Sequence, residues 1–156
     1  MLDFNDYGTL VDTFHERLTH VSEEQASIKL SEEKWTLKEI IGHLIDSASN
    51  NHQRFVRLQF GDLRGFPAYD GEQWVKIQQY NRLDWDRLIL LWHSYNLLVL
   101  HVIRHTENSA LSNVWEKDDV AIPLGELIVD YYRHMKVHIE QFESRLREGQ
   151  DIGHIG

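Results

Sequence analysis

The segment LGELIVDYYRHMKVHIEQF (residues 124–142) has apolar side chains at the three- and four-residue spacing of an amphipathic helix. Pro123, a favoured first-turn residue, precedes it. Its apolar side chains form one arc of the helix, and His134 and His138 lie at the border of that arc, about 40° apart. Both imidazoles of such an i, i+4 pair can reach one metal ion.

A second segment, WTLKEIIGHLIDS (residues 35–47), has the signals of a helix start. Thr36 is a good N-cap, and Glu39 three residues later completes a capping box. His43 lies at the edge of this helix's apolar arc, as the other two histidines do on theirs. If the two edges meet, His43, His134 and His138 can hold one metal ion and leave coordination positions open for water or substrate.

Three polar residues of this helix are candidate catalytic groups: Asn50 and Arg54, which continue the stripe of His43, and Asp46, which lies about 60° from His43 and outside the apolar arc. Asp46 has three alternative roles: a general base, a group that orients a ligand histidine, or a solvent-facing carboxylate. Arg54 could bind a substrate carboxylate or phosphate. Its alternative is an ion pair with a neighbouring helix.

The hydrophobic periodicity predicts an all-α protein. Long helices are expected over residues 3–29, 36–59, 84–105 and 123–147. The connection 61–82 holds a short helical piece, and no strand is expected, since Val120-Ala121-Ile122 is too short for a sheet. Four such helices favour a four-helix bundle. The long connection allows the second and third helices to run parallel, joined by a crossover.

The length and composition limit the domain count and the class of partner. The 156 residues fit one domain, expected over residues 1–148, with a flexible C-terminal tail over 149–156. The net charge of −9 and the lack of a Lys/Arg run argue against a nucleic-acid partner. No apolar run reaches the length of a membrane span, and the acidic start lacks a secretory core segment.

The chain contains no cysteine, which fits a cytoplasmic protein and excludes a cysteine nucleophile or thiolate ligand. Thiol chemistry would therefore need a thiol from a cosubstrate. The predicted helix 84–105 is apolar nearly all round, so it should be covered on both sides. Either the long loops or a second subunit could cover it, and we expect a homodimer.

Both histidine segments resemble the motifs of the DinB/YfiT-like superfamily. Residues 35–47 resemble its W-[ST]-x-x-E-x-x-x-H-L-x-D-S signature, and residues 124–142 are similar to its final-helix motif with HxxxH and a following Gln. Residues 69–75 resemble a less distinctive central motif. The resemblance implies a bundle of up-down-down-up topology and a divalent metal, zinc or nickel, at His43, His134 and His138. Many members have a further His where this chain has Val137, but that position points away from the ligand face.

A metal with three neutral imidazoles would lower the pKa of a bound water or thiol. The resemblance implies two kinds of enzyme: S-transferases that use a low-molecular-weight thiol, and metal-dependent hydrolases of small molecules. Thiol transfer to a small electrophile is narrowly favoured, because no residue is clearly placed as a general base for hydrolysis. The alternatives are a non-catalytic metal-binding stress-response protein and an interaction module without metal.

Overall fold

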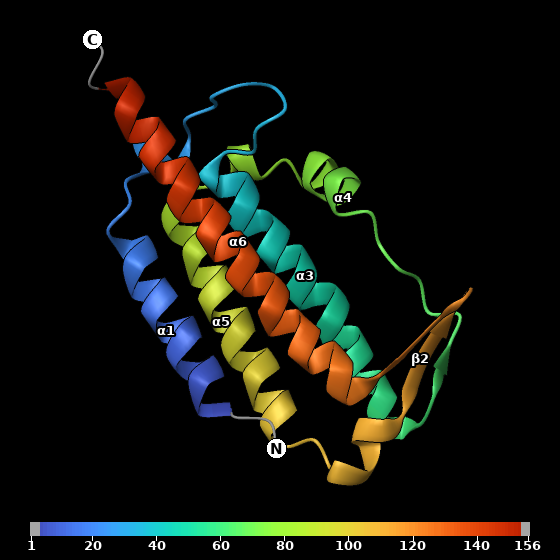
Figure 1. The fold of residues 1–156 in the computed structure, drawn as a ribbon. Helices are drawn as coiled ribbons and strands as arrows, with labels where there is room; N and C mark the ends of the chain where they lie inside the picture. The colour runs from blue at the N-terminus through green and yellow to red at the C-terminus, as the bar shows by residue number, and fades with distance from the viewer. Residues whose placement is uncertain (1–3, 154–156) are drawn as a thin grey trace.

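The computed structural model of the chain describes residues 4–153. Four long helices form a bundle (Figure 1): α1 (Phe4–Thr19), α3 (Leu37–Arg57), α5 (Trp85–Arg104) and α6 (Leu124–Gly153). Helices α1 and α6 run in one direction, and α3 and α5 run in the other. This is the predicted up-down-down-up bundle, with a long crossover between the parallel helices α3 and α5.

Two of the predicted helix boundaries are wrong. The first long helix ends at Thr19, because Val21 N–H bonds back to the carbonyl of Leu18 in a tight turn and Ser22 then caps a separate short helix, α2 (Glu23–Ala26). At the other end, α6 continues to Gly153, so residues 149–153 of the predicted tail are helical. Residues 154–156 lie outside the described part of the chain.

A small sheet closes one end of the bundle, where no strand was predicted. Strands β2 (Val114–Lys117) and β3 (Val120–Pro123) form an antiparallel hairpin, and β1 (Leu63–Arg64) pairs with β2 in parallel. Asp118 turns the hairpin with a left-handed φ of 54°. The hairpin residues are too few to give a strand pattern, and β1 finds its partner far along the chain, so periodicity could not reveal the sheet.

Short helices fill the crossover and the sheet connection. The crossover holds η1 (Leu58–Phe60), α4 (Gly71–Gln78) and η2 (Tyr80–Arg82), and η3 (Asn108–Ser112) leads into β2. Figure 1 shows α4 beside α3, away from the centre of the bundle. This position lets the crossover cover the N-terminal half of α3.

Large aromatic side chains fill the core of the bundle. Trp85, Trp92, Phe55 and Phe142 are at most 1% exposed. Phe14 of α1 packs edge-on against Trp92 at 5.2 Å and against Phe142 at 5.3 Å between ring centroids, so one ring joins α1, α5 and α6. Full burial of each such side chain stabilises the fold by about 1.5–3 kcal/mol.

Helix α5 keeps an apolar stripe on the surface of the single chain. Leu90, Leu91, Leu97 and Leu98 are between 43% and 60% exposed. Their spacing of seven residues places them on one face. Among residues 4–153, no helix has both the length and the hydrophobicity needed to cross a bilayer.

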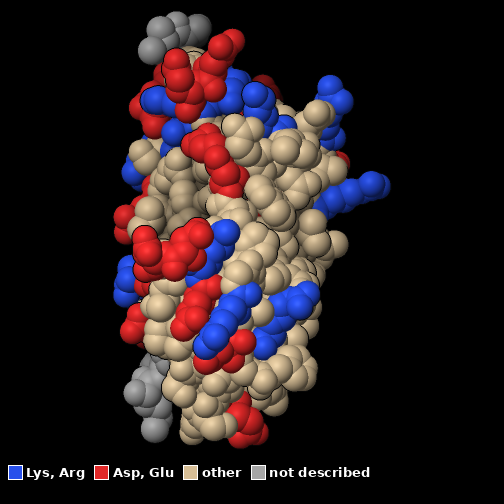
Figure 2. All heavy atoms as spheres, turned by 90° about the vertical axis from the view of Figure 1, so that its right-hand side faces the viewer, with Lys and Arg blue, Asp and Glu red and all other residues tan. Residues whose placement is uncertain are grey.

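Figure 2 shows the side of the molecule that carries α4 and the strands. Acidic and basic side chains are interspersed there, and a broad area has neither. No continuous basic stripe runs across this face. The distribution is unlike the charged track on which nucleic-acid binders rely.

The crossover is attached to α3 at Gly42. A Cβ at this position would lie 2.0 Å from Cδ2 of Tyr80, so only glycine lets the Tyr80 ring of η2 pack this closely against the helix. The Tyr80 hydroxyl then donates a 2.5 Å hydrogen bond to Oδ1 of the buried Asp46. Gln78 donates to the same oxygen at 3.0 Å.

We predict that Gly42→Ala destabilises the protein by about 1–3 kcal/mol, because the added methyl group must displace the Tyr80 ring. Urea unfolding measures the change. Gly125→Ala is the control, since its Cβ would lie 3.5 Å from the Leu111 carbonyl, an ordinary contact. The control should be neutral or up to about 1 kcal/mol more stable. Equal stability of wild type and Gly42→Ala would contradict the packing described here.

Candidate metal centre

Helices α3 and α6 bring three histidines together. Nε2 of His134 lies 3.1 Å from Nε2 of His43 and 3.0 Å from Nε2 of His138. One ligand atom from each residue lies within 4.8 Å of the other two. The predicted trio therefore converges, although its members are far apart in sequence.

The local sequence explains why the imidazoles face each other. The Thr36 side chain accepts a hydrogen bond from the backbone of Glu39, and the Glu39 side chain accepts one from the backbone of Thr36, which fixes the start of α3. His43 then lies on the second turn, beside the apolar side chains that pack the helix into the bundle. On α6, one turn separates His134 from His138, so both point to α3.

The spacing of the nitrogens fits a metal ion. Ligands at about 2.05 Å from zinc lie about 3.3 Å apart in a tetrahedral site and about 2.9 Å apart in an octahedral one. The two short nitrogen distances, 3.0 and 3.1 Å, lie between these values. The set of three imidazoles suits zinc or nickel better than the oxygen-preferring magnesium or calcium.

Gln141 selects the tautomer of His138. Nδ1 of His138 donates a 2.7 Å hydrogen bond to Oε1 of Gln141, so its Nε2 is left with a lone pair that points to the other two rings. A partner on the far nitrogen is a common feature of metal-bound histidine. Three nitrogens this close have too few protons for each pair of them to form a hydrogen bond. A cation would bind all three lone pairs.

Two of the histidines are held in the neutral form. Burial, reinforced by the neighbouring imidazoles, lowers the pKa of His43 to about 3. The same causes, burial first and His138 second, lower the pKa of His134 to about 4. Both rings are therefore unprotonated at neutral pH, which is the form that binds metal.

The walls around the trio are tight on one side. The Trp35 ring lies 4.9 Å from the His43 ring and 6.4 Å from the His138 ring, between centroids. Gly71, the first residue of α4, lies so close that an added Cβ would be 2.9 Å from Cε1 of His43. His43 is 7% exposed as a result. Access must come from another direction.

A pocket of about 230 Å³ lies beside the trio on the side of the sheet, and of the three histidines His134 lines it. The other lining residues come from α3, the crossover, the sheet and α6: Ser47, Asn51, Arg54, Tyr69, Trp115, Ile122, Leu127, Asp130 and Tyr131. The pocket gives a small molecule a route to an imidazole of the candidate metal centre.

Of the three predicted catalytic candidates, only Arg54 lines this pocket. Asp46 is fully buried, so its solvent-facing alternative is wrong. It accepts hydrogen bonds from Tyr80 and Gln78 rather than from a histidine, and burial raises its pKa. The Asn50 amide donates to the Asp46 carbonyl one turn back on its own helix.

Arg54 does not form the predicted alternative, an ion pair with a neighbouring helix. None of the ion pairs within residues 4–153 includes it. The residue is 6% exposed, and its guanidinium carbon Cζ lies 4.4 Å from the ring centroid of Trp115. Burial lowers its pKa from the ordinary value.

The sequence analysis did not single out several of the pocket residues, among them Asn51, Tyr69, Trp115 and Asp130. Asn51 lies about 80° from His43 around α3, within the apolar arc, so a polar residue among core positions was the available signal. Asp130 lies one turn before His134, and that spacing was also visible. Trp115 had no signal, because the sheet that positions it was not predicted.

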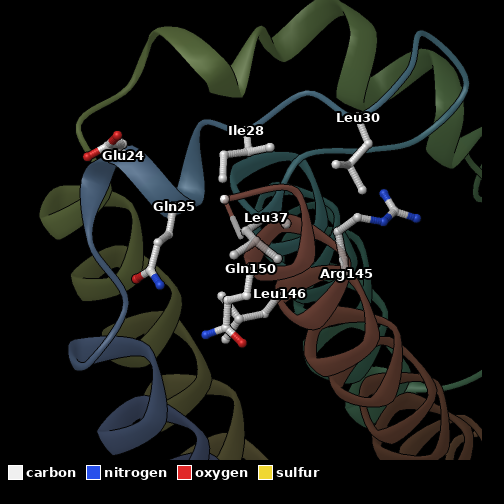
Figure 3. Close-up of a pocket in the computed structure, with 10 residues that line it drawn as sticks. Glu24, Gln25, Ile28, Leu30, Leu37, Arg145, Leu146 and Gln150 are labelled. Atoms are coloured by element: carbon white, nitrogen blue, oxygen red, sulfur yellow. The ribbon is translucent and has the colours of Figure 1, made fainter. Parts of the chain in front are cut away.

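Another pocket, of about 260 Å³, lies between α2 and the last turns of α6 (Figure 3). Its apolar wall includes Ile28, Leu37 and Leu146. The Arg145 guanidinium at its edge donates to the Trp35 carbonyl and faces Glu148. None of the three histidines lines this pocket, so it is not the candidate metal centre.

Comparison with known proteins adds a family and two structural neighbours. A family model described as the DinB superfamily matches residues 9–142. No curated protein matches the chain in sequence. YfiT from Bacillus subtilis, described as "a probable metal-dependent hydrolase with an unusual four-helix bundle topology", aligns with a TM-score of 0.78 at 16% identity over 93% of this chain and 86% of that one.

A mycothiol-dependent maleylpyruvate isomerase aligns with a TM-score of 0.60 at 19% identity. The alignment covers 95% of this chain but only 58% of the isomerase, so the latter has a large part without a counterpart here. At these identities, both likenesses show a shared fold.

Proposed function

This chain belongs to the DinB superfamily, and from that premise we propose that it is a metal-dependent enzyme that transfers a thiol to small electrophiles. His43, His134 and His138 would hold a divalent cation, zinc or nickel. The observation that carries the proposal is the convergence of their three Nε2 atoms beside a pocket. When bound, the cation would lower the pKa of a thiol or water ligand and so supply a nucleophile at neutral pH.

The residues of this chain have separate roles in such a reaction. The trio supplies three neutral ligands and no fourth protein ligand, because the ligand cluster found in residues 4–153 contains no carboxylate. Gln141 fixes the orientation of His138. Trp35 and Gly71 keep water from the closed side of His43. The thiol must come from outside, since the chain has no cysteine.

Hydrolysis is the second candidate function, and Asp130 is the observation that favours it. Asp130 lies one turn before His134 and lines the same pocket, where a general base could accept a proton from water. However, its Oδ1 accepts a 2.5 Å hydrogen bond from Arg133 in an exposed ion pair, which disfavours proton transfer. The names of the two structural neighbours record both chemistries, one hydrolytic and one thiol-dependent. A non-catalytic metal-binding role is the third alternative.

We also propose that two copies of the chain associate through the apolar stripe of α5. Leu90 and Leu97, like Leu91 and Leu98, are seven residues apart, a spacing that keeps apolar side chains on one seam between two helices. Burial of these side chains by a second subunit would remove them from water.

The metal site is tested by metal analysis of the purified protein and two variants. Wild type should contain about one equivalent of divalent metal, and His134→Ala should lose nearly all of it, because two imidazoles seldom hold a labile cation through purification. His52→Ala is the control, since His52 lies further along α3 and hydrogen-bonds to the Tyr95 hydroxyl of α5. Retention of metal by His134→Ala would contradict the proposed ligands.

The reaction class is tested with Asp130→Asn. In thiol transfer to an aryl chloride, the thiol loses its proton to water, the sulfur–carbon bond forms, the carbon–chlorine bond breaks and chloride leaves. The rate of this thiol transfer, with cysteine or glutathione as the thiol, should change less than about threefold in Asp130→Asn. If hydrolysis is the function, loss of the base should lower the rate on a nitrophenyl ester by about 100-fold or more. No turnover in either assay by metal-loaded wild type would favour the non-catalytic role.

The oligomeric state is tested by light scattering at micromolar concentration. Wild type should have the mass of two chains, and the double variant Leu91→Glu/Leu98→Glu the mass of one, because two charges cannot be buried in an apolar seam. Leu83→Glu is the control, since Leu83 is 42% exposed but lies outside α5. A monomeric wild type would refute this association.

A further inference from the structure

Arg54 is a buried cation that has few hydrogen-bond partners. Its guanidinium has five N–H donors, and two hydrogen bonds with protein acceptors are present. Nη1 donates to Oδ1 of Asn51 at 3.4 Å, and Nη2 donates to the Pro67 carbonyl at 3.3 Å. Both are long, and Nε has no hydrogen-bond partner in the part of the chain that the structure describes. An arginine that is only 6% exposed normally pairs with a carboxylate or forms a set of short hydrogen bonds.

Aromatic rings hold this charge in place. The Arg54 carbon Cζ lies 4.4 Å from the Trp115 ring centroid and 5.9 Å from the Tyr69 ring centroid. Trp115 is itself fixed by a 2.9 Å hydrogen bond from its indole N–H to the Phe66 carbonyl. The rings stabilise the cation but leave its N–H edge without an anionic partner. The guanidinium is therefore oriented before any ligand arrives.

The same pocket connects Arg54 with the candidate metal centre. Arg54 and His134 both line it. Residues 43 and 54 are about 16 Å apart along α3 at 1.5 Å per residue. The Arg54 side chain leans back toward the start of the helix, where Nη1 reaches Asn51, so the guanidinium lies closer to the trio than this spacing of the helix positions. A small elongated molecule can span that interval.

We propose that Arg54 binds a carboxylate of the small molecule whose reactive end lies at the three histidines. This proposal rests on the proposed function for the position of the reactive end. A carboxylate matches the planar fork of a guanidinium and would supply the short, charged hydrogen bonds that the protein does not. Asp130, the carboxylate in the pocket lining, is exposed and pairs with Arg133.

A purely structural role for Arg54 predicts different behaviour. The contacts with Pro67 and Trp115 join α3 to the crossover and the sheet. If these contacts were the whole role, Arg54→Met would lower stability and weaken charged and neutral ligands alike. An anion-binding role predicts that only the charged ligand is weakened.

The experiment compares pairs of thiols on the cobalt-loaded protein. Mercaptopropanoate, mercaptohexanoate and mercaptooctanoate are each titrated beside the corresponding amide, and the sulfur-to-cobalt absorption band reports the dissociation constant. We expect at least one acid to bind about 10- to 100-fold more tightly than its amide, because a charged hydrogen-bond pair has that effect. Arg54→Met should abolish the difference and leave the amide affinity unchanged.

Two further variants make the result specific. Arg57→Met is the matched control, because Arg57 is an exposed arginine on the same helix that contacts the Phe66 ring at 5.3 Å; it should keep the full preference. Arg54→Lys, which keeps the charge without the fork, should show a reduced preference. Equal binding of acid and amide by wild type, or a preference that survives in Arg54→Met, would overturn the proposal.

A failure of the metal site can be told apart from a failure of the Arg54 site. If no thiol produces the absorption band, the proposed function fails, and Arg54 is then tested in metal-free protein by the NMR signal of the Trp115 indole N–H. Hexanoate, but not hexanamide, should shift that signal, and Arg54→Met should not respond. In the metal-loaded protein, hexanoate is added together with a neutral thiol. If both bind at once, the carboxylate belongs to the electrophile. If hexanoate and the thiol compete, the carboxylate belongs to the thiol.

Discussion

The antiparallel packing of α3 against α6 is the constraint on which the candidate site depends. Each helix buries an apolar arc in the bundle, and each has histidine at the border of that arc. Because a helix is stiff over several turns, burial of the apolar arcs also fixes the positions of the side chains at their borders. His43 therefore meets His134 and His138 as a consequence of core packing. Their nitrogens need no loop to bring them together.

The same packing makes the close approach of the three histidines energetically unfavourable in the absence of a metal ion. Burial holds His43 and His134 neutral, and no group within residues 4–153 forms a hydrogen bond with Nδ1 of His43. The close approach of Gly71 and the ring of Trp35 prevent His43 from turning away. The fold thus holds three lone pairs at metal-binding distance. A bound cation would relieve part of the cost of holding them together and so would raise the free energy of unfolding.

The crossover and the small sheet convert a bundle edge into a pocket. Helices alone would leave the side chains of Arg54 and His134 at an open surface. Trp115 on β2 and Tyr69 in the crossover enclose that surface and hold the guanidinium between aromatic rings. Since Tyr80 packs on Gly42 and binds Asp46, the crossover is itself attached to the helix that carries His43. The irregular segments decide what can reach the metal-binding residues.

Periodicity and capping signals by themselves determined the four long helices, their apolar arcs and the histidines at the borders. These features repeat every few residues and so depend on local geometry. The resemblance supplied the topology. Only the tertiary structure decided that Asp46 bonds to Tyr80, that Arg54 has no ion-pair partner among residues 4–153, and that Trp115 covers it. Those contacts join residues separated by tens of positions through short strands and turns, and such segments have no period from which their partners could be inferred.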